Sequence, residues 1–234
     1  MKQLRVVRPE LPEGIAALPV RTPLVAPRDD LTALIARCVR GIARPGDVLA
    51  VSETAVAIAQ GQSVPAELVR PGKLAYVLSR HAGALATVSQ PESLQIVIDQ
   101  TGPGKVLFAA VMQVIGRAFG RRGMFYEILG EAITAIDGYT GTLPPFERNI
   151  VFAPQRPDAF AQSVCERTGI ACTVVDANDL QKAKVLGASR GVNRRSVEYA
   201  LLANPHGNGD EQTPIVVLKW RGEGPNPLFA ERPA

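Results

Sequence analysis

Apolar residues recur at helical spacing in several segments of the chain. The clearest helix follows Asp29 and Asp30, which can cap it. Residues three or four positions apart form its apolar face: Leu31, Leu34, Ile35, Cys38, Val39 and Ile42. The same spacing, with proline, asparagine or glycine near the ends, predicts helices over 91–101, 157–169 and 193–202.

Other segments are rich in β-branched residues or alternate apolar and polar positions, which is typical of strands. Residues 15–27 alternate but are interrupted by three prolines, so we expect an edge strand or an extended arm there. Residues 124–138 indicate a hairpin with its turn at Gly130 and Glu131. Further β segments are predicted at 47–61, 149–154, 171–179, 185–189 and 214–220.

The order of these segments favours an α+β fold. Strands and helices mix without regular β-α-β alternation, so we expect mixed sheets with flanking helices. Residues 104–115 are apolar on every side and predict a buried segment, whether it is helix or strand. We expect residues 1–222 to form a single domain or two intertwined subdomains, and residues 223–234 to form a loose tail.

Composition narrows the classes of partner. Hydrophobic residues make up 46% and charged residues 21% of the 234 residues, which is typical of a folded globular protein. The net charge of +4 favours an anionic ligand. The cations are spread along the chain rather than gathered with aromatic residues, so we expect no nucleic-acid partner. Without a signal-peptide pattern or a run of roughly 18 apolar residues, we expect a cytoplasmic protein with no membrane partner.

The chain contains none of the common nucleotide-binding or hydrolase motifs. We find no Walker loop, no dinucleotide-binding glycine fingerprint, no HExxH and no G-x-S-x-G. Cys38, Cys165 and Cys172 are an odd number of cysteines at no metal-ligand spacing, and we interpret them as buried apolar thiols in a reducing compartment.

The strongest candidate for a ligand-binding segment is GRAFGRRG, which runs from Gly116 to Gly123. Glycines let backbone N–H groups approach a ligand closely, and arginine offers planar paired donors for phosphate or carboxylate. We therefore predict a nucleotide- or phosphate-binding role for Gly116, Arg117, Arg121, Arg122 and Gly123. The alternative interpretation is a solvated turn that carries surface arginines.

A second group of candidates is acidic. Asp137 ends the segment TAIDG, and Asp176, Asn178 and Asp179 follow a predicted strand in VVDANDL. Carboxylate and amide oxygens suit Mg²⁺ or Mn²⁺, so Asp137, Asp176 and Asp179 are candidate metal ligands. The alternative is turn and N-cap chemistry, which Asp and Asn perform in most proteins.

The loop NPHGNGDEQTP at 204–214 is a third candidate region. Asp210 and Glu211 could face a ligand there, although a plain loop rich in turn formers is the simpler interpretation. His81 is a possible general base, against the alternative of a structural histidine.

Three stretches of the chain stand out together by their order: RDDLTALIARCVRGIARPGDVLAVSETAVAIAQGQ, QVIGRAFGRRG and SVEYALLANPHGNGDEQTPIVVLKWRG. In this order they resemble the coenzyme F420-0:γ-glutamyl ligase family. The resemblance implies a GTP- and metal-dependent amide ligase. Such an enzyme activates a phospholactate carboxylate as an acyl phosphate, which the amine of glutamate then attacks. The resemblance also implies an intertwined homodimer with an anionic small-molecule substrate.

The chain departs from the family pattern just before its Gly-Arg pair. Gln113 and Val114 stand where the family carries Asp-Thr, so a carboxylate is missing there. Two hypotheses follow. Either other acids hold a metal and the ligase chemistry is retained, or the chain is a non-catalytic or regulatory metabolite-binding protein that kept the fold. Gln113 and Asn178 remain candidates for ligand contact under both hypotheses.

Overall fold

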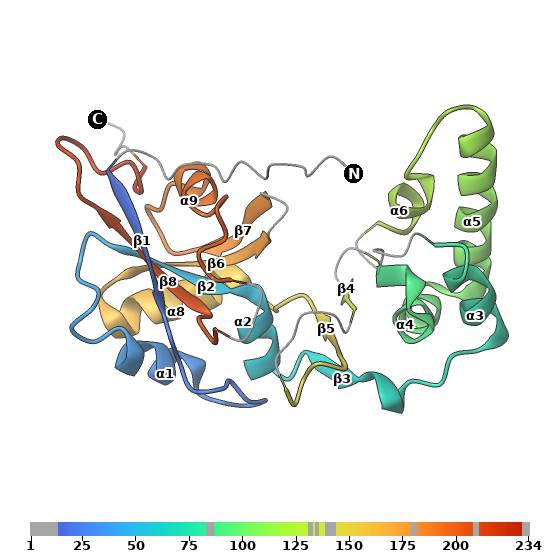
Figure 1. Cartoon of the computed structure of the whole chain (residues 1–234), viewed down its shortest axis with the longest axis horizontal. Coiled ribbons are helices and arrows are strands. Elements are labelled where there is room, and N and C mark those ends of the chain that lie inside the picture. Colours follow the sequence, from blue (N-terminus) through green and yellow to red (C-terminus); the bar gives the residue numbers. More distant parts are fainter. Residues whose placement is uncertain are drawn as a thin grey trace, which may run out of the picture. The chain divides into compact units, whose positions relative to one another are not determined.

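The computed structural model divides the chain into two compact units (Figure 1). Unit 1 contains residues 1–61 and 154–234, and unit 2 contains residues 62–153. The structure describes residues 14–82, 87–130, 133, 136–138, 144–178, 182–207 and 211–230. Helices and mixed sheets occur together, which confirms the α+β class.

Unit 1 is built on a five-stranded sheet. In spatial order its strands are β1 (Ile15–Val20), β8 (Ile215–Trp220), β2 (Val48–Ser52), β6 (Ala171–Asn178) and β7 (Lys182–Ala188). β2 and β6 run parallel, and the other neighbours are antiparallel. β1 is an edge strand, as predicted, and this position allows it to contain Pro19, which has no N–H to donate to a second neighbour.

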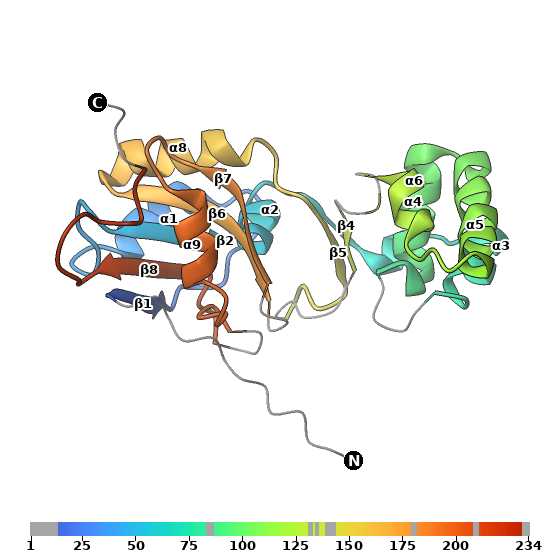
Figure 2. The same ribbon diagram turned by 90° about the horizontal axis from the view of Figure 1, so that it is seen from above.

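Helices cover both faces of this sheet. α9 (Arg194–Ala200) lies on one face, and α1 (Leu31–Cys38) and α8 (Pro157–Thr168) lie on the other (Figure 1). Figure 2 looks down on α9 in front of the strands. Under α9, the core consists of alternate strand residues and the buried side of the helix, and its members include Ile15, Val48, Val216, Leu218, Val197, Leu201 and Leu228.

Local sequence explains how the helices of unit 1 begin and pack. The side chain of Asp30 accepts a hydrogen bond from the backbone N–H of Ala33 at 2.9 Å, so it caps α1 as predicted. Gly187 of β7 lies directly against the start of α8, because a Cβ at Gly187 would overlap the backbone of Pro157. The absence of a side chain at Gly187 therefore sets how closely α8 approaches β7.

Unit 2 is mainly helical. Its helices are α3 (Lys73–Ser79), α4 (Pro91–Thr101), α5 (Pro103–Ala118) and α6 (Met124–Leu129), with 3₁₀ turns at Ala66–Leu68 and Thr87–Ser89. A small antiparallel sheet has the order β3 (Ser63–Pro65), β5 (Asn149–Phe152) and β4 (Ile136–Asp137). The helices enclose a separate core whose members include Leu94, Val97, Ile98, Val106, Leu129 and Ile150.

Three of the predicted elements are wrong in type or burial. The second half of 47–61 forms a helix, α2 (Glu53–Ala59), with Val56 fully buried. The predicted hairpin at 124–138 begins instead as α6, because Phe125, Ile128 and Leu129 are spaced to reach the core from a helix. The apolar segment 104–115 is helical, but its outward face is exposed rather than buried.

The other predicted elements are present. Helices occur at 91–101, 157–168 and 194–200, and strands occur at 149–152, 171–178, 182–188 and 215–220. Cys172 is buried, which raises the pKa of its thiol, whereas Cys38 and Cys165 are half-buried. No helix in the described part of the chain is long and apolar enough to cross a membrane.

Candidate functional site

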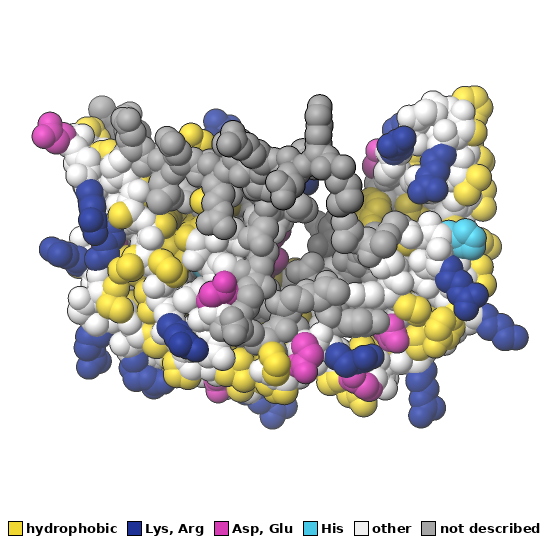
Figure 3. Space-filling view, viewed as in Figure 1, with side chains coloured by type: hydrophobic (Ala, Val, Ile, Leu, Met, Phe, Trp, Pro, Cys, Tyr) yellow, Lys and Arg dark blue, Asp and Glu magenta, His cyan; other side chains and the backbone are white. Residues whose placement is uncertain are grey.

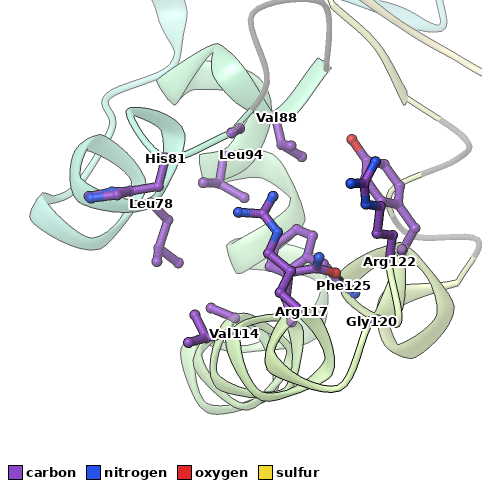
Figure 4. A pocket seen from close by; sticks show the side chains of 14 residues that line it. Leu78, His81, Val88, Leu94, Val114, Arg117, Gly120, Arg122 and Phe125 are labelled. Atoms are coloured by element: carbon purple, nitrogen blue, oxygen red, sulfur yellow. Dashed lines mark hydrogen bonds between the residues drawn. The ribbon is translucent and has the colours of Figure 1, made fainter.

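Unit 2 contains a cavity of about 850 Å³, lined by residues from α3 to α6 (Figure 4). Its walls are mostly apolar, and the main apolar residues are Leu78, Ala82, Val88, Leu94, Val114 and Phe125. Leu94 and Val88 are buried members of the unit's core, so this part of the wall is rigid. A cavity of this size and lining suits a small molecule with an apolar body.

The polar groups of the cavity come mainly from the end of α5 and the start of α6. They are Gln113, Arg117, Arg122 and Tyr126, with His81 from the end of α3. In Figure 4 the guanidinium of Arg117 projects from α5 between Leu94 and Phe125, and Arg122 stands to one side. Among the described residues that line the cavity there is no carboxylate, so its fixed charge is positive.

A tight turn between α5 and α6 positions the two arginines. Gly120 has the left-handed φ of +76°, and the backbone N–H of Arg121 donates to the carbonyl of Gly116 at 2.8 Å. This arrangement closes the C-terminus of α5. The N–H of Gly120 likewise donates to the carbonyl of Arg117 at 3.1 Å. The backbone N–H groups of Gly120 and Arg121 thus cap α5 and are not available to an anion.

Gln113 links the two helices that carry the arginines. Its Oε1 accepts a hydrogen bond from the backbone N–H of Phe125 at 2.9 Å, in the first turn of α6. Gly123, which precedes α6, has a left-handed φ of +89° that a residue with a side chain adopts less readily. The amide of Gln113 therefore holds the α5–α6 frame as well as lining the cavity.

Two residues of the predicted GRAFGRRG site do not line the cavity. Gly116 is buried inside α5, where a Cβ would overlap the Sδ of Met124. Gly116 thus allows α6 to pack closely on α5. The Arg121 guanidinium lies 3.3 Å from a carboxylate oxygen of Glu127, and both side chains are exposed. Of the five predicted residues, the structure brings Arg117, Arg122 and Gly123 to the cavity.

Tyr126 and His81 are the other cavity groups with proton chemistry. Burial raises the pKa of the Tyr126 hydroxyl, so the phenol stays protonated at neutral pH and can donate a hydrogen bond. The Nδ1 of His81 lies 2.8 Å from the carbonyl oxygen of Val77, and its ring points away from Arg117 in Figure 4. His81 is therefore not aimed at the arginines in this conformation.

The acidic candidates do not form a metal site within the described residues. Asp176 of β6 lies opposite Lys184 of β7 in the strand register. Burial raises the pKa of the Asp176 carboxyl and the Lys184 charge lowers it. In the part of the chain that the structure describes, no group of three or more His, Cys, Asp or Glu is placed so that it could hold a metal ion. The side chains of Asp137 and Asp179 lie outside the described residues.

The candidates in the remaining loops also lie partly inside and partly outside the described residues. Asn178 ends β6 opposite Lys182, and Asp210 lies outside the described residues. The carboxylate of Glu211 lies over Gly207, where an added Cβ would be 2.8 Å from Oε1. All of these residues belong to unit 1, whereas the cavity belongs to unit 2.

Sequence reasoning missed the apolar walls of the cavity. Leu78, Leu94 and Phe125 come from three different helices, and no local pattern distinguishes them from ordinary core residues. Tyr126 was available as a signal, because it follows the Gly-Arg segment by three residues. The hairpin predicted over 124–138 placed Tyr126 in a strand, whereas it lies in the first turn of α6.

The cavity and its arginines fall inside a match to a known family. The family model for F420-0:gamma-glutamyl ligase matches residues 19–175, which is 157 of the 234 residues. The chain belongs to the F420-0:gamma-glutamyl ligase family. The match confirms the resemblance, and it includes all of unit 2. A search of curated proteins found no significant relative.

Proposed function

We propose that this member of the F420-0:gamma-glutamyl ligase family is an amide ligase that holds a phosphorylated, anionic substrate in the cavity of unit 2. The observation that supports the proposal is the placement of Arg117 and Arg122 in a mostly apolar cavity. Guanidinium groups bind phosphate and carboxylate through paired, charge-assisted hydrogen bonds. The apolar walls would take the uncharged body of the same molecule.

The proposed reaction has two steps. The γ-phosphoryl group of GTP moves to the substrate carboxylate, which releases GDP and forms an acyl phosphate. The amine of an amino acid, which we take to be glutamate, then attacks the acyl carbon. A C–N bond forms, phosphate leaves with the C–O bonding electrons, and the amine loses a proton. Arg117 and Arg122 would stabilise the negative charge that both steps concentrate on phosphate oxygens.

The family resemblance also implies Mg²⁺ or Mn²⁺, which would neutralise nucleotide phosphates when bound. The described residues do not supply a matching set of donors, because nowhere among them do three or more His, Cys, Asp or Glu side chains lie close enough together to hold a metal ion. Asp176 in particular lies opposite Lys184 in the strand register. The described residues therefore offer no ligand set for this cation.

A second candidate function is binding of a phosphorylated metabolite without catalysis. The observation that favours it is the role of Gln113, which stands where the family has a carboxylate. Its Oε1 is already bonded to the N–H of Phe125. An uncharged amide used as a link between helices has no obvious part in metal-assisted phosphoryl transfer. The cavity would then serve recognition alone.

One assay distinguishes the two candidates. The full chain is titrated with GTP and Mn²⁺ by calorimetry, and then incubated with GTP, Mn²⁺, glutamate and F420-0. For the ligase we expect GTP binding, release of GDP that requires both other substrates, and a product heavier by one glutamate residue. Binding of F420-0 without GDP release would favour the non-catalytic protein. If neither GTP nor ATP binds, the ligase proposal fails.

We further propose that the protein acts in the cytoplasm as a homodimer, as the family resemblance implies. The oligomeric state is measured independently of catalysis, by light scattering of the full chain over a range of concentrations.

A further inference from the structure

The outward side of α5 carries a continuous set of exposed apolar side chains. Six large residues between 44% and 82% exposed make up this set, which we name the α5 outer face: Leu107, Phe108, Val111, Val114, Ile115 and Phe119. Figure 3 shows hydrophobic side chains in a strip along the edge of unit 2 on which α5 runs. A protein that works as a monomer seldom leaves such a strip in water.

Helical geometry separates this face from the rest of α5. Val106, Ala109 and Gly116 are buried on the opposite side and pack into unit 2. At 100° per residue, the α5 outer face is centred well over 90° away from these three residues. The folding of unit 2 therefore does not require the α5 outer face to be apolar. Its apolar character needs a different explanation.

The spacing on the α5 outer face suits another helix. Leu107, Val111, Val114 and Ala118 follow one another at intervals of four, three and four residues. This is the spacing of a seam between two packed helices. The helix is 16 residues long, or about 24 Å, which is enough for a pair of helices to share several turns.

The exposed area is of the size that a dimer requires. At about 150 to 200 Å² for a fully exposed large side chain, the six residues present on the order of 500 to 700 Å² of apolar surface. A stable interface buries about 800 Å² on each partner. The α5 outer face would supply most of this area, and the polar residues at its margin would supply the rest.

The pattern of sizes and charges fits a second copy in antiparallel orientation. With Val111 of one copy against Val114 of the other, bulky Leu107 lies against small Ala118. Residues 102–126 contain four cations and no carboxylate, which at first argues against self-pairing. However, Arg121 is already paired with Glu127. At 100° per residue, Lys105 lies about 150° around α5 from the centre of the seam, so its charge does not face the second copy.

We propose that the α5 outer face binds the same face of a second copy of this chain in antiparallel orientation. This inference rests on the homodimer proposed above and names its surface. The face is distinct from the cavity except at Val114, which borders both. Dimer formation would therefore cover one side of the cavity entrance and restrict how a substrate enters.

The test is the oligomeric state of full-length variants by analytical ultracentrifugation. Phe108→Glu and Val111→Glu each place a charge on the α5 outer face, and neither residue lines the cavity. We expect a dimer for the unaltered chain and at least about 100-fold weaker association for both variants. Leu68→Glu is the matched control, since Leu68 is 74% exposed in the same unit but lies outside α5. It should leave the dimer intact.

Other outcomes overturn the inference in recognisable ways. A dimer that survives both α5 variants would locate the contact elsewhere and leave the homodimer proposal standing. A monomer at every concentration would refute both this inference and the homodimer proposal. A monomer that binds phosphatidylglycerol vesicles through Phe108 would assign the face to lipid instead. Calorimetry with GTP on the same samples tests the ligase separately, so a chain that dimerises through α5 without binding nucleotide would refute only the ligase. Circular dichroism confirms that each variant is folded.

Discussion

The side-chain oxygen of Gln113 and the backbone N–H of Phe125 are joined by a hydrogen bond of 2.9 Å. This bond fixes the end of α5 to the start of α6, the two elements that carry Arg117 and Arg122. Gln113 thus has a structural role of its own. Different substitutions of Gln113 can therefore separate its effect on stability from its effect on ligand binding.

Gln113→Ala should destabilise the protein by about 0.5 to 1.5 kcal/mol, because the Phe125 N–H loses its acceptor. Gln113→Glu keeps an oxygen in the same place and should cost less stability. It also adds a negative charge to the wall that holds Arg117, so it should weaken binding of an anion more than its effect on stability suggests. Urea unfolding and calorimetry with GTP measure the two effects. Equal losses of stability in both variants would contradict this role.

Arg117 and Arg121 are four residues apart but have different surroundings. Arg117 lines the cavity, whereas the guanidinium of Arg121 is bonded to Glu127 outside it. Arg117→Ala should weaken GTP or substrate binding by roughly 1 to 3 kcal/mol if it holds an anion, and the loss should shrink at high salt. Arg121→Ala is the matched control and should change affinity little. Titration of both variants at two salt concentrations checks this, and equal losses would remove Arg117 from the site.

Gly187 and the backbone of Pro157 approach so closely that no Cβ fits between them. Gly187→Ala should therefore destabilise unit 1 by about 1 to 3 kcal/mol, since β7 and α8 must move apart. Gly104→Ala is a suitable control, because Gly104 lies in α5, and a Cβ there meets nothing within 4 Å. That change should be neutral or slightly stabilising. Thermal unfolding of both variants gives the comparison, and a silent Gly187→Ala would refute the contact.

Sequence reasoning succeeded where a local signal decides the structure. Asp30 caps α1, and Pro157 and Gly169 bound α8, because capping and backbone conformation depend on a few neighbouring residues. Two short helices, α2 with seven residues and α6 with six, were instead predicted as β structure. Their apolar residues span fewer than two turns, which is too short for helical spacing to be distinguished from strand alternation.

The cavity was predictable only in part. Its arginines lie in one conspicuous segment, so the sequence indicated Arg117 and Arg122. Leu78 and Leu94 reach the same cavity from α3 and α4 through tertiary packing, which single-sequence patterns do not report. The exposure of α5 was unpredictable for a related reason. A segment that is apolar on all sides predicts a buried helix, and the sequence alone does not indicate which side the fold leaves exposed.

His206 is buried in unit 1, and its Nδ1 lies 3.1 Å from the carbonyl oxygen of Thr213. Burial lowers the pKa of its imidazole from 6.5 to about 4, and the Thr213 carbonyl opposes this shift. Above pH 6.5 the imidazole is neutral in both the folded and the unfolded chain. As the pH falls from 6.5 to 4, the unfolded chain binds a proton that the folded chain does not. Stability should therefore fall with decreasing pH across this window, by roughly 2 to 4 kcal/mol in total.

This dependence can be assigned because the chain contains only two histidines. His206→Gln should remove most of the loss of stability between pH 6.5 and 4, measured as the urea midpoint at each pH. His81→Gln is the control and should keep the loss, because His81 is exposed. Proton NMR of the two imidazole rings provides the direct measurement. If the His206 ring titrates near pH 6.5 in the folded protein, its burial does not control acid stability, and the remaining pH dependence belongs to the carboxylates.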